Sequence, residues 1–485
     1  MFETGVRQLR LALAMVWGRP LNVGVLTGLV DDALATLREF GEPGDDVGQL
    51  VDGPFADPTV RRDLTERALR RTARRLVNVS PFYAQRFAAA GVDPRRLTVD
   101  NLGELPLTVK ADLVAEPRAF LCAGSTPVIS TRTTGSTGAP VEIWLSRYEA
   151  SMWPAFAALS GILRGEIGPT DAMQVCLSSR ATAAVQQDVG VCRLAGARAD
   201  VVGLVPPDEA LDAMLHGKPT ILATYPSYLA LLIKAAARRG VGPAEFRLRR
   251  VDTGGEVLST ALAAAARETF GTPNINDTFA MTEVLPVTGR SCNLGHLHHD
   301  LNTGHVEVLS VATGEPATAG ELGTVVITPY YPYRECMPVF RYDTRDLVRV
   351  LPDGPLGCDL AGTPATSLIL GKFEGLPRGA ATGGRAAGAG SRAAGATTRD
   401  LVEALEALPT RPWPARFRAE VLDDGRLGLT LPHSTVDGFG ADAVTTHLAD
   451  RGLDVELRIV ADDEATALRA VRADLIESTF TTRAY

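Results

Sequence analysis

Residues 130–140 read Ser-Thr-Arg-Thr-Thr-Gly-Ser-Thr-Gly-Ala-Pro, and this stretch decides how the rest of the chain is interpreted. It places six hydroxyl side chains and two glycines around one turn, between two predicted strands within 128–145. Backbone N–H groups around Gly135 and Gly138 can form an anion-binding nest, and the hydroxyls add donors for phosphate oxygens. No Lys-Ser or Lys-Thr pair follows the second glycine, so the stretch is not a P-loop. A surface hairpin rich in Ser and Thr is the alternative interpretation.

Three further motifs each follow a predicted strand. Asp252-Thr-Gly-Gly-Glu256 has a glycine pair where the backbone must approach something flat. Asp277-Thr-Phe-Ala-Met-Thr-Glu283 offers an aromatic ring, a hydroxyl and a carboxylate, which suit a base, a phosphate and Mg²⁺. Phe340-Arg-Tyr-Asp-Thr-Arg-Asp346 ends in a carboxylate that suits a two-point grip on ribose hydroxyls. Taken singly, each motif is also explained by a strand that ends in a solvated turn.

The apolar pattern predicts an α/β arrangement for the region that holds these motifs. Between 151 and 290, helical stretches alternate with short strand-like runs, which is typical of a largely parallel sheet. From 303 to 350 the pattern changes to strands and turns and predicts a β-rich subdomain. The first group of predicted strands is Ala172–Leu177, Thr220–Ala223, Leu248–Thr253 and Asn274–Phe279. The second group is His305–Ser310, Gly323–Pro329, Val339–Tyr342 and Leu347–Val350.

A low-complexity segment separates the C-terminal part. Of the 18 residues from 379 to 396, 14 are Gly or Ala, which leaves too little side chain to bury and predicts a flexible linker. Two helical stretches and several strands follow it. We therefore expect an α/β fold made of a large N-terminal domain and a small mobile α+β lid domain. The predicted boundaries are 1–370 with a β-rich subdomain at about 300–370, a hinge and linker at 371–398, and the lid at 399–485.

Composition limits the partners and the location. A net charge of -8 argues against binding to nucleic acid or to an anionic membrane surface. Six cysteines in 485 residues do not form a disulfide framework. The apolar stretch Leu11–Val30 is interrupted by Arg19, Pro20 and Asn22, so we expect an amphipathic helix and its turn there and no transmembrane helix. The expected location is the cytoplasm.

The four motifs occur in one order across about 220 residues, and together they resemble those of the adenylate-forming enzymes: acyl-CoA synthetases, adenylation domains and luciferases. The closer resemblance is to the phenylacetate–CoA ligase branch. Val79-Ser-Pro-Phe-Tyr83 and Leu105-Pro-Leu-Thr-Val-Lys110 support that branch, as do Gly320-Glu-Leu-Gly-Thr324 and Met337-Pro-Val-Phe-Arg-Tyr342. The resemblance covers roughly 57–375 and implies ATP-dependent adenylation with Mg²⁺.

The resemblance also implies a role for each matched residue. The phosphate loop falls on Thr133 to Pro140, Thr282 would contact the α-phosphate, and Glu283 would hold Mg²⁺. Asp346 would bind the ribose hydroxyls, and Phe279, where the family has Tyr, would pack on adenine. The implied catalytic residues are Thr133, Thr134, Thr282 and Glu283. The implied nucleotide-binding and pocket residues are Gly135, Ser136, Thr137, Gly138, Gly254, Gly255, Glu256, Asp277, Phe279, Asp346 and Lys372.

The sequence departs from the family in its basic residues. Ala139 replaces the loop lysine, and Arg345 replaces the glycine of the ribose-binding turn. The chain has four lysines against 45 arginines, and none follows Lys372, so the family's C-terminal catalytic lysine has no counterpart. The Gly/Ala stretch stands in place of the family's segment after the hinge. Either adenylation runs without that lysine or the N-terminal domain does most of the work; the arginines that would supply its charge are Arg469, Arg472 and Arg483.

Cysteine and histidine residues indicate a metal site. Members of the branch often carry Cys, His and a later Cys-x-Cys in this region, and only Cys358 of the latter pair is present. The implied tetrahedral Zn²⁺ ligands are Cys292, His298, Cys336 and Cys358. The alternative is free thiols beside a solvated His-rich loop. Three further cysteines in apolar surroundings are expected to be core thiols, namely Cys122, Cys176 and Cys192.

Three functions stay open. The first is an adenylating ligase that activates a small aromatic acid and passes the acyl group to CoA or an amine. The second is an ATP-dependent diazotase, in which nitrite is activated for attack by an aromatic amine. An eroded C-terminal domain fits a diazotase and an amide-forming ligase equally. The third is a non-catalytic nucleotide-binding homologue. A homodimer is a further expectation, because dimers are common in the branch.

Overall fold

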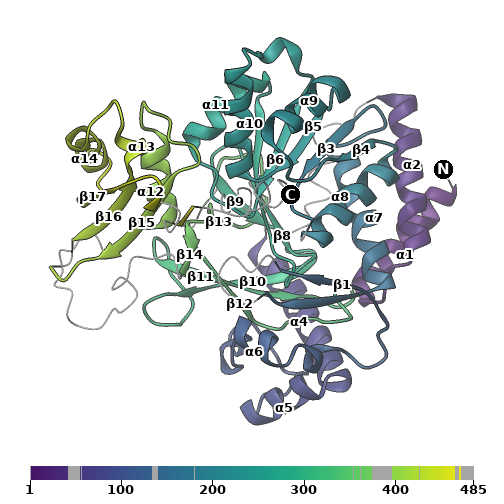
Figure 1. The fold of residues 1–485 in the computed structure, drawn as a ribbon. Helices are drawn as coiled ribbons and strands as arrows, with labels where there is room; N and C mark the ends of the chain where they lie inside the picture. The colour runs from purple at the N-terminus through teal and green to yellow at the C-terminus, as the bar shows by residue number, and fades with distance from the viewer. Residues whose placement is uncertain are drawn as a thin grey trace.

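The protein has an α/β body with a smaller C-terminal unit at one side (Figure 1). The computed structural model describes residues 2–41, 55, 57–133, 140–179, 181–352, 354, 356–360, 362–373, 396–424, 426–464 and 469–470. The predicted linker, apart from residue 396, and Thr134 to Ala139 of the phosphate loop lie outside these residues. The expected α/β class with a smaller α+β unit is confirmed.

An eight-stranded sheet forms the centre of the described body, in the order β13-β9-β8-β7-β6-β5-β3-β4. Neighbouring strands from β4 to β7 run parallel, and β8, β9 and β13 extend the sheet antiparallel. The parallel strands are β3 (Ala172–Cys176), β4 (Arg198–Val201), β5 (Ile221–Thr224), β6 (Arg250–Gly254) and β7 (Asn274–Ala280). The others are β8 (Thr288–Ser291), β9 (His296–His299) and β13 (Ala365–Ser367). All four strands predicted between 151 and 290 are present within a few residues.

Helices cover both faces of this sheet (Figure 1). One apolar core joins one face to α9 (Pro207–Gly217), α10 (Pro226–Arg238) and α11 (Thr260–Phe270). A second core joins the other face to α2 (Val23–Phe40), α7 (Arg147–Leu163) and α8 (Thr182–Ala195). Successive side chains of a strand point to opposite faces of a sheet. Val251 of β6 is buried in the first core and Val175 of β3 in the second. The strands are therefore fixed in register by burial on both sides.

Local signals set the ends of these helices. Ser146 accepts a hydrogen bond from Glu149 N, while the Glu149 carboxylate accepts from Ser146 N, and this reciprocal pair starts α7. Ser259 caps the start of α11 through Leu262 N. Gly271 ends that helix in the left-handed region, with φ of 71°. Pro226 stands in the first turn of α10, where a missing N–H costs nothing.

A four-stranded antiparallel sheet follows, in the order β10-β11-β12-β14. Its strands are β10 (Gly304–Ser310), β11 (Leu322–Pro329), β12 (Tyr342–Arg349) and β14 (Gly371–Lys372). The prediction of separate strands at Val339–Tyr342 and Leu347–Val350 is wrong, since a single strand, β12, begins at Tyr342 and ends at Arg349, and residues 339–341 are not in a strand. The pairing register shifts between Thr324 and Val326, which accommodates the polar turn-like residues inside β12.

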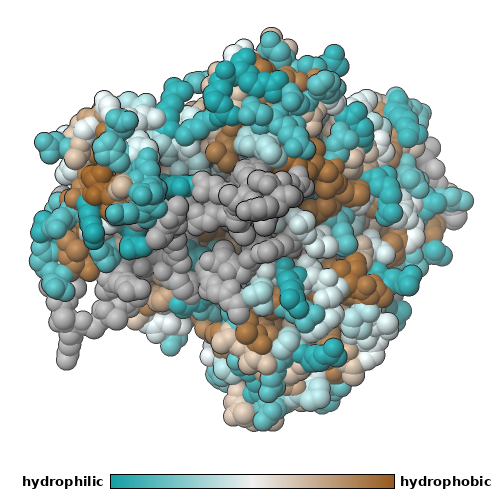
Figure 2. Space-filling model, in the orientation of Figure 1, coloured by the Kyte–Doolittle hydropathy of each residue, from teal (hydrophilic) through white to brown (hydrophobic). Residues whose placement is uncertain are grey.

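The N-terminal segments surround this sheet and the body. None of the helices in the described ranges has the length and apolar character needed to cross a bilayer. Figure 2 shows a mainly hydrophilic face with hydrophobic residues in scattered patches. The remaining helices are α1 (Phe2–Trp17), α4 (Pro58–Val79), α5 (Pro81–Ala90) and α6 (Lys110–Ala115), with 3-10 turns at Leu102–Glu104, Pro117–Phe120 and Pro243–Glu245. A hairpin of β1 (Pro127–Arg132) and β2 (Glu142–Ser146) flanks the phosphate loop.

The C-terminal unit has its own sheet and core. Its four strands are ordered β17-β16-β15-β18, and its apolar core includes Leu401, Leu429 and Leu448. Trp413 instead packs in the core of the main sheet, so the unit is docked on the body. The elements are α12 (Thr398–Glu406), β15 (Arg416–Val421), β16 (Leu427–Pro432), α13 (His433–Val436), α14 (Ala441–Ala449), β17 (Val455–Val460) and β18 (Arg469–Ala470).

Candidate active site

The ends of β6, β7 and β12 open into one large cavity of about 1590 Å³. Ligands of α/β proteins bind where the carboxyl ends of parallel strands meet, so the cavity lies where the topology predicts a site. Sequence motifs far apart in the chain converge here. The predicted residues that line the cavity are Thr133, Gly254, Gly255, Glu256, Asp277, Phe279, Thr282, Glu283, Asp346 and Lys372. Thr134, Gly135, Ser136, Thr137 and Gly138 lie outside the described residues.

The glycine pair after β6 has a backbone reason. A Cβ on Gly254 would stand 2.7 Å from the Thr278 carbonyl oxygen of β7, closer than a side chain permits. Gly255 has φ of 75°, in the left-handed region that favours glycine. Glu256 then turns its carboxylate onto Ser227 N (2.8 Å) at the start of α10. The motif therefore shapes the cavity wall and also caps a helix.

Glu283 is a buried carboxylate at the rim of β7. It is 5% exposed, and burial raises its pKa, while Lys372 and Lys110 favour the charged form and oppose that rise. In the described part of the chain no other side chain hydrogen-bonds to it. Hard oxygen donors of this kind are what Mg²⁺ prefers, and Thr282 adds a hydroxyl on the same cavity wall. The donor set therefore fits a magnesium–nucleotide complex.

Asp346 and Lys372 form the opposite wall. The Lys372 ammonium lies 2.8 Å from Asp346 Oδ2 and donates to the Thr344 carbonyl at 2.9 Å. Pairing of β12 with β14 sets these two residues opposite each other in register. Asp346 is buried, and its backbone N–H donates to Thr344 Oγ1. One acidic group and one cation thus face the cavity from adjacent strands.

Asp277 has a partner that the sequence did not reveal. Its Oδ2 atom lies 3.1 Å from Nη2 of Arg399, the second residue of α12. Burial raises the pKa of Asp277, and Arg399 opposes that rise. Arg399 also donates to the Ile369 and Leu258 carbonyls at 2.7 and 2.8 Å. A buried arginine of the C-terminal unit therefore reaches the cavity wall.

Phe279 and Thr133 are placed by apolar packing and by strand pairing. Phe279 is 7% exposed and meets His299 edge-on, with ring centroids 6.1 Å apart. Thr133 closes the β1–β2 hairpin, since its N–H donates to the Val141 carbonyl and its hydroxyl accepts from Val141 N, both at 3.0 Å. The hairpin thus places Thr133, where the predicted phosphate loop begins, at the cavity.

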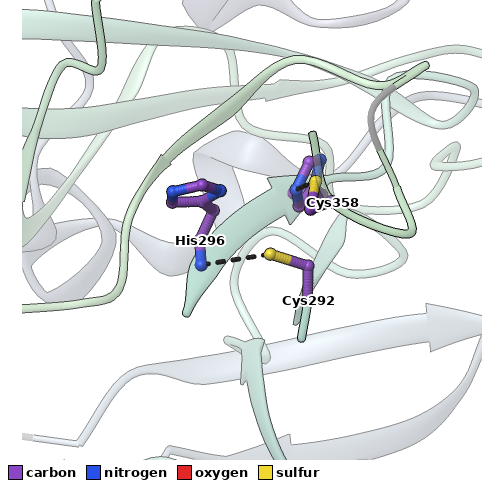
Figure 3. Close-up of side chains that lie close together, drawn as sticks. Cys292, His296 and Cys358 are labelled. Atoms are coloured by element: carbon purple, nitrogen blue, oxygen red, sulfur yellow. Dashed lines mark hydrogen bonds between the residues drawn. The ribbon is translucent and has the colours of Figure 1, made fainter. Parts of the chain in front are cut away.

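A separate cluster joins the hairpin of β8 and β9 to the loop before β13. One ligand atom each from Cys292, His296, His298 and Cys358 lies within 4.8 Å of the others. Figure 3 shows Cys292 and His296 beside Cys358. The backbone N–H of His296 donates to Cys292 Sγ at 3.2 Å. Two thiols and two imidazoles match a tetrahedral Zn²⁺ donor set.

His298 is oriented for such a role. Its Nδ1 lies 2.8 Å from the Thr363 carbonyl, which needs a proton on Nδ1 and leaves the Nε2 lone pair toward Cys358 Sγ, 3.4 Å away. Cys336 does not join the cluster, which corrects its assignment as a ligand. Its N–H donates to the Glu149 carboxylate, and its carbonyl accepts from Cys122 N. His296 takes the fourth position instead.

Two residues near the sites, His296 and Arg399, were not predicted from the sequence, and they differ in whether the sequence could have identified them. His296 precedes His298 by two residues in β9, and alternate strand residues share a face, so the pattern could have identified it. Arg399 carried no local signal, because one arginine among 45 has nothing in its neighbours that marks it. Its role depends on docking of the C-terminal unit.

Comparisons with known proteins agree with the fold and the motifs. The family model described as AMP-binding enzyme matches residues 88–330. A phenylacetate-coenzyme A ligase of Pseudomonas putida is 27% identical over 303 residues, 61% of this chain and 66% of that protein. The ligase of the same name from Escherichia coli (strain K12) is 27% identical over 281 residues, 56% and 63% of the two chains. The matched region thus spans slightly less than two thirds of these relatives.

Solved structures show the same fold. A 2-hydroxyisobutyryl-CoA ligase in the postadenylation state with 2-HIB-AMP has a TM-score of 0.68 and 18% identity, covering 87% of this chain and 92% of that chain. The same ligase with 2-HIB-AMP and CoA in the thioesterification state has a TM-score of 0.58 and 18% identity, covering 88% and 94%. Since the family model matches half of the chain, the chain belongs to the AMP-binding enzymes, and it is similar to phenylacetate-coenzyme A ligases among them.

Proposed function

We propose that this protein activates a small acid with ATP. A carboxylate or similar oxyanion attacks the α-phosphorus, the bond to the pyrophosphate oxygen breaks, and an AMP mixed anhydride forms. The observation that carries the proposal is the convergence of Thr282, Glu283, Asp346 and Lys372 on one cavity. The reaction needs little acid–base chemistry, because alignment and charge stabilisation supply most of the catalysis.

Each residue has a distinct task in this proposal. Glu283 would hold Mg²⁺, which when bound neutralises charge on the phosphates. Thr282 and Thr133 donate hydroxyl hydrogens to phosphate oxygens. Asp346 accepts from the ribose hydroxyls and is held in place by Lys372. The glycine pair lets the backbone of β6 lie flat against the base or the acid.

We propose transfer to a thiol or an amine as the second step. The curated relatives are named as coenzyme A ligases, which supports CoA as the acceptor. The absence of lysine after Lys372 favours a different second step, because the family's lid lysine has no counterpart. Nitrite activation followed by attack of an aromatic amine is the alternative that this absence supports, and an amide-forming ligase fits it equally.

One set of assays separates these functions. Purified protein is incubated with ATP and Mg²⁺ plus either aromatic acids or nitrite with aromatic amines, and pyrophosphate and product masses are followed. Pyrophosphate release with a carboxylic acid selects the ligase, and addition of CoA or amines then identifies the acceptor. Pyrophosphate release only in the mixtures of nitrite with an aromatic amine selects the diazotase. AMP binding without release in any mixture would contradict catalysis and leave a nucleotide-binding homologue.

We further propose that the cluster of Cys292, His296, His298 and Cys358 holds a structural Zn²⁺. The geometry that supports it is the close approach of four ligand atoms and the Nδ1 bond of His298. The cluster links the antiparallel extension of the main sheet to the chain before β13, so the metal would fix that edge of the sheet.

A further inference from the structure

The cavity continues beyond the nucleotide motifs into an inner lobe between the main sheet and the helices α7 and α8. Residues of β6 alternate in direction, so Arg250, Asp252 and Gly254 share the cavity face while Val251 is buried on the other. With a rise of about 3.3 Å per residue, Asp252 lies about 7 Å and Arg250 about 13 Å along the strand from Gly254. The inner lobe is thus within one small molecule's length of the adenylation motifs.

Helical periodicity builds the opposite wall. Trp153, Ala157, Ser160 and Arg164 follow one another at spacings of three or four residues and line the cavity from α7. Small side chains at the middle two positions leave room for a ligand. Phe156 adds an aromatic ring, packed against Tyr333 at 5.9 Å between centroids. The lobe therefore has an aromatic wall facing a polar strand.

The charged side chains on the polar strand form ion pairs. Arg250 Nε lies 2.9 Å from Asp252 Oδ2, and the Asn276 amide donates to Asp252 Oδ1 at 2.9 Å. Arg290 is paired with Glu166 at 3.2 Å. Arg250 and Asp252 thus form one ion pair and Arg290 and Glu166 another, although Arg250 Nε makes no hydrogen bond within the described residues.

Asp188 differs from them. It stands on α8, lines the cavity and is partly exposed. Across the described residues no donor lies within hydrogen-bonding distance of its carboxylate. Burial raises its pKa to about 7, repulsion by Asp252 adds to that rise, and Arg250 opposes it. Asp188 therefore faces the ion pair of Arg250 and Asp252 without a hydrogen-bond partner of its own among the described residues.

We propose that the inner lobe binds the amino group of an aromatic substrate, and that Asp188 determines this specificity. An amino group offers N–H donors to a carboxylate that has none, and the ring lies on the aromatic wall. A second carboxylate on the ligand at this position would meet repulsion from Asp188 and Asp252. This inference rests on the proposed adenylation in one respect: the acid group of the substrate points toward the adenylation motifs and its ring points into the inner lobe.

The test measures binding and turnover separately. Calorimetry gives the affinity of 3-aminobenzoate, 4-aminobenzoate, benzoate and 3-hydroxybenzoate, each in the presence of AMP and Mg²⁺, for the unmodified protein and for Asp188→Asn. We expect at least one aminobenzoate to bind about tenfold more tightly than benzoate, and Asp188→Asn to remove that preference while leaving benzoate binding nearly unchanged. The control is Asp208→Asn, which makes the same charge change at an exposed ion pair with Arg238.

The outcomes separate the inference from the proposed function. Equal binding of amino and unsubstituted ligands, or equal loss for both in Asp188→Asn, would overturn the amine specificity. Pyrophosphate release with benzoate but with no aminobenzoate would overturn it as well. Tight, Asp188-dependent binding of an aminobenzoate supports the inference even when no acid or nitrite mixture releases pyrophosphate, a result that would contradict the proposed adenylation alone.

Discussion

Arg345 adopts a backbone conformation that arginine rarely takes. Its φ is 61°, in the left-handed region, at the position where the family has glycine. The guanidinium lies 3.8 Å from the centroid of the Phe373 ring and 3.6 Å from Asp343. The backbone therefore keeps the turn that positions Asp346, and contacts of the side chain compensate for a conformation that costs about 1–2 kcal/mol.

Substitution of Arg345 tests that balance. Arg345→Gly removes the backbone strain and the ring contact together, so we expect stability within about 1 kcal/mol of the unmodified protein or slightly above it. Arg345→Ala keeps the strain and loses the contact, so we expect it to be less stable by about 1 kcal/mol. Urea unfolding midpoints give the order. An alanine variant more stable than the glycine variant would contradict this account.

Glu283 gives the second prediction at this scale. Replacing the carboxylate with an amide in Glu283→Gln keeps the shape and removes the charge that would hold Mg²⁺. We expect turnover to fall by at least about 100-fold, while the thermal midpoint changes little or rises, because a buried charge is lost. Pyrophosphate release and thermal unfolding are measured together. Glu268→Gln on the exposed side of α11 is the control, and near-normal turnover of Glu283→Gln would place the metal elsewhere.

At the scale of elements, α12 is held to the start of α11 by two carboxylates. Glu406 Oε2 lies 2.6 Å from Ser259 Oγ, and Glu403 Oε2 accepts from Thr260 N at 2.8 Å. Acidic groups favour a helix N-terminus, which explains why α12 docks there. Glu406 also accepts from Ala415 N, so it ties the docked helix to the C-terminal sheet.

Docking of α12 should depend on pH. Burial raises the pKa of Glu406 to about 7, and Glu403 and Glu256 nearby add to the rise. Between pH 4.5 and 7 the Glu406 carboxyl therefore keeps its proton when α12 is docked, and it loses that proton when α12 is undocked and its pKa returns to about 4.5. The contribution is therefore fully present below about pH 4.5 and is lost as pH rises toward 7. Hydrogen exchange of α12 should speed up between pH 5 and 8 beyond the intrinsic rate increase, and Glu406→Gln should remove that excess. An identical excess in the variant would contradict it.

The Cys–His cluster gives a prediction for the β8–β9 hairpin. Cys292→Ser should abolish bound zinc and lower the thermal midpoint by several degrees, because a structural metal contributes directly to folding stability. The variant Cys192→Ala, at a buried position of α8 far from the cluster in sequence, should keep its zinc. Cys336→Ser should keep it also, which separates this cluster from the one predicted from sequence. Elemental analysis showing only traces of zinc in the unmodified protein would contradict the site.

At the scale of the whole molecule, Arg399 connects the C-terminal unit to the cavity wall. Removing one partner of a buried ion pair leaves the other charge uncompensated, so Arg399→Ala should cost about 3 kcal/mol. The double variant Arg399→Met with Asp277→Asn should recover part of that loss, because neither charge is left unpaired. Calorimetric unfolding measures both. Arg458→Ala on an exposed strand position is the control, and an equally small effect at both arginines would contradict a bridging role.

The sequence alone determined the class of the protein and ten of the residues that line its cavity. Alternation of helix and strand, and glycine or polar residues after each strand, are local patterns, and local patterns predict strand ends well. Gly254, Thr282, Glu283 and Asp346 were predicted in this way and line one cavity. Tertiary structure decided which distant groups meet. Asp277 and Arg399 are 122 residues apart, and His296 rather than Cys336 joins the Cys–His cluster.

There is a physical reason why the sequence predicts strand ends but not contacts between distant residues. A strand end is fixed by its own few residues, whereas a contact across the molecule depends on the register of the sheet and on how the C-terminal unit docks. The carboxylate of Asp188 is a product of packing, because α8 and β6 together place it near the ion pair of Arg250 and Asp252. Sequence therefore identified the adenylating family, and only the tertiary structure showed what its inner lobe lacks.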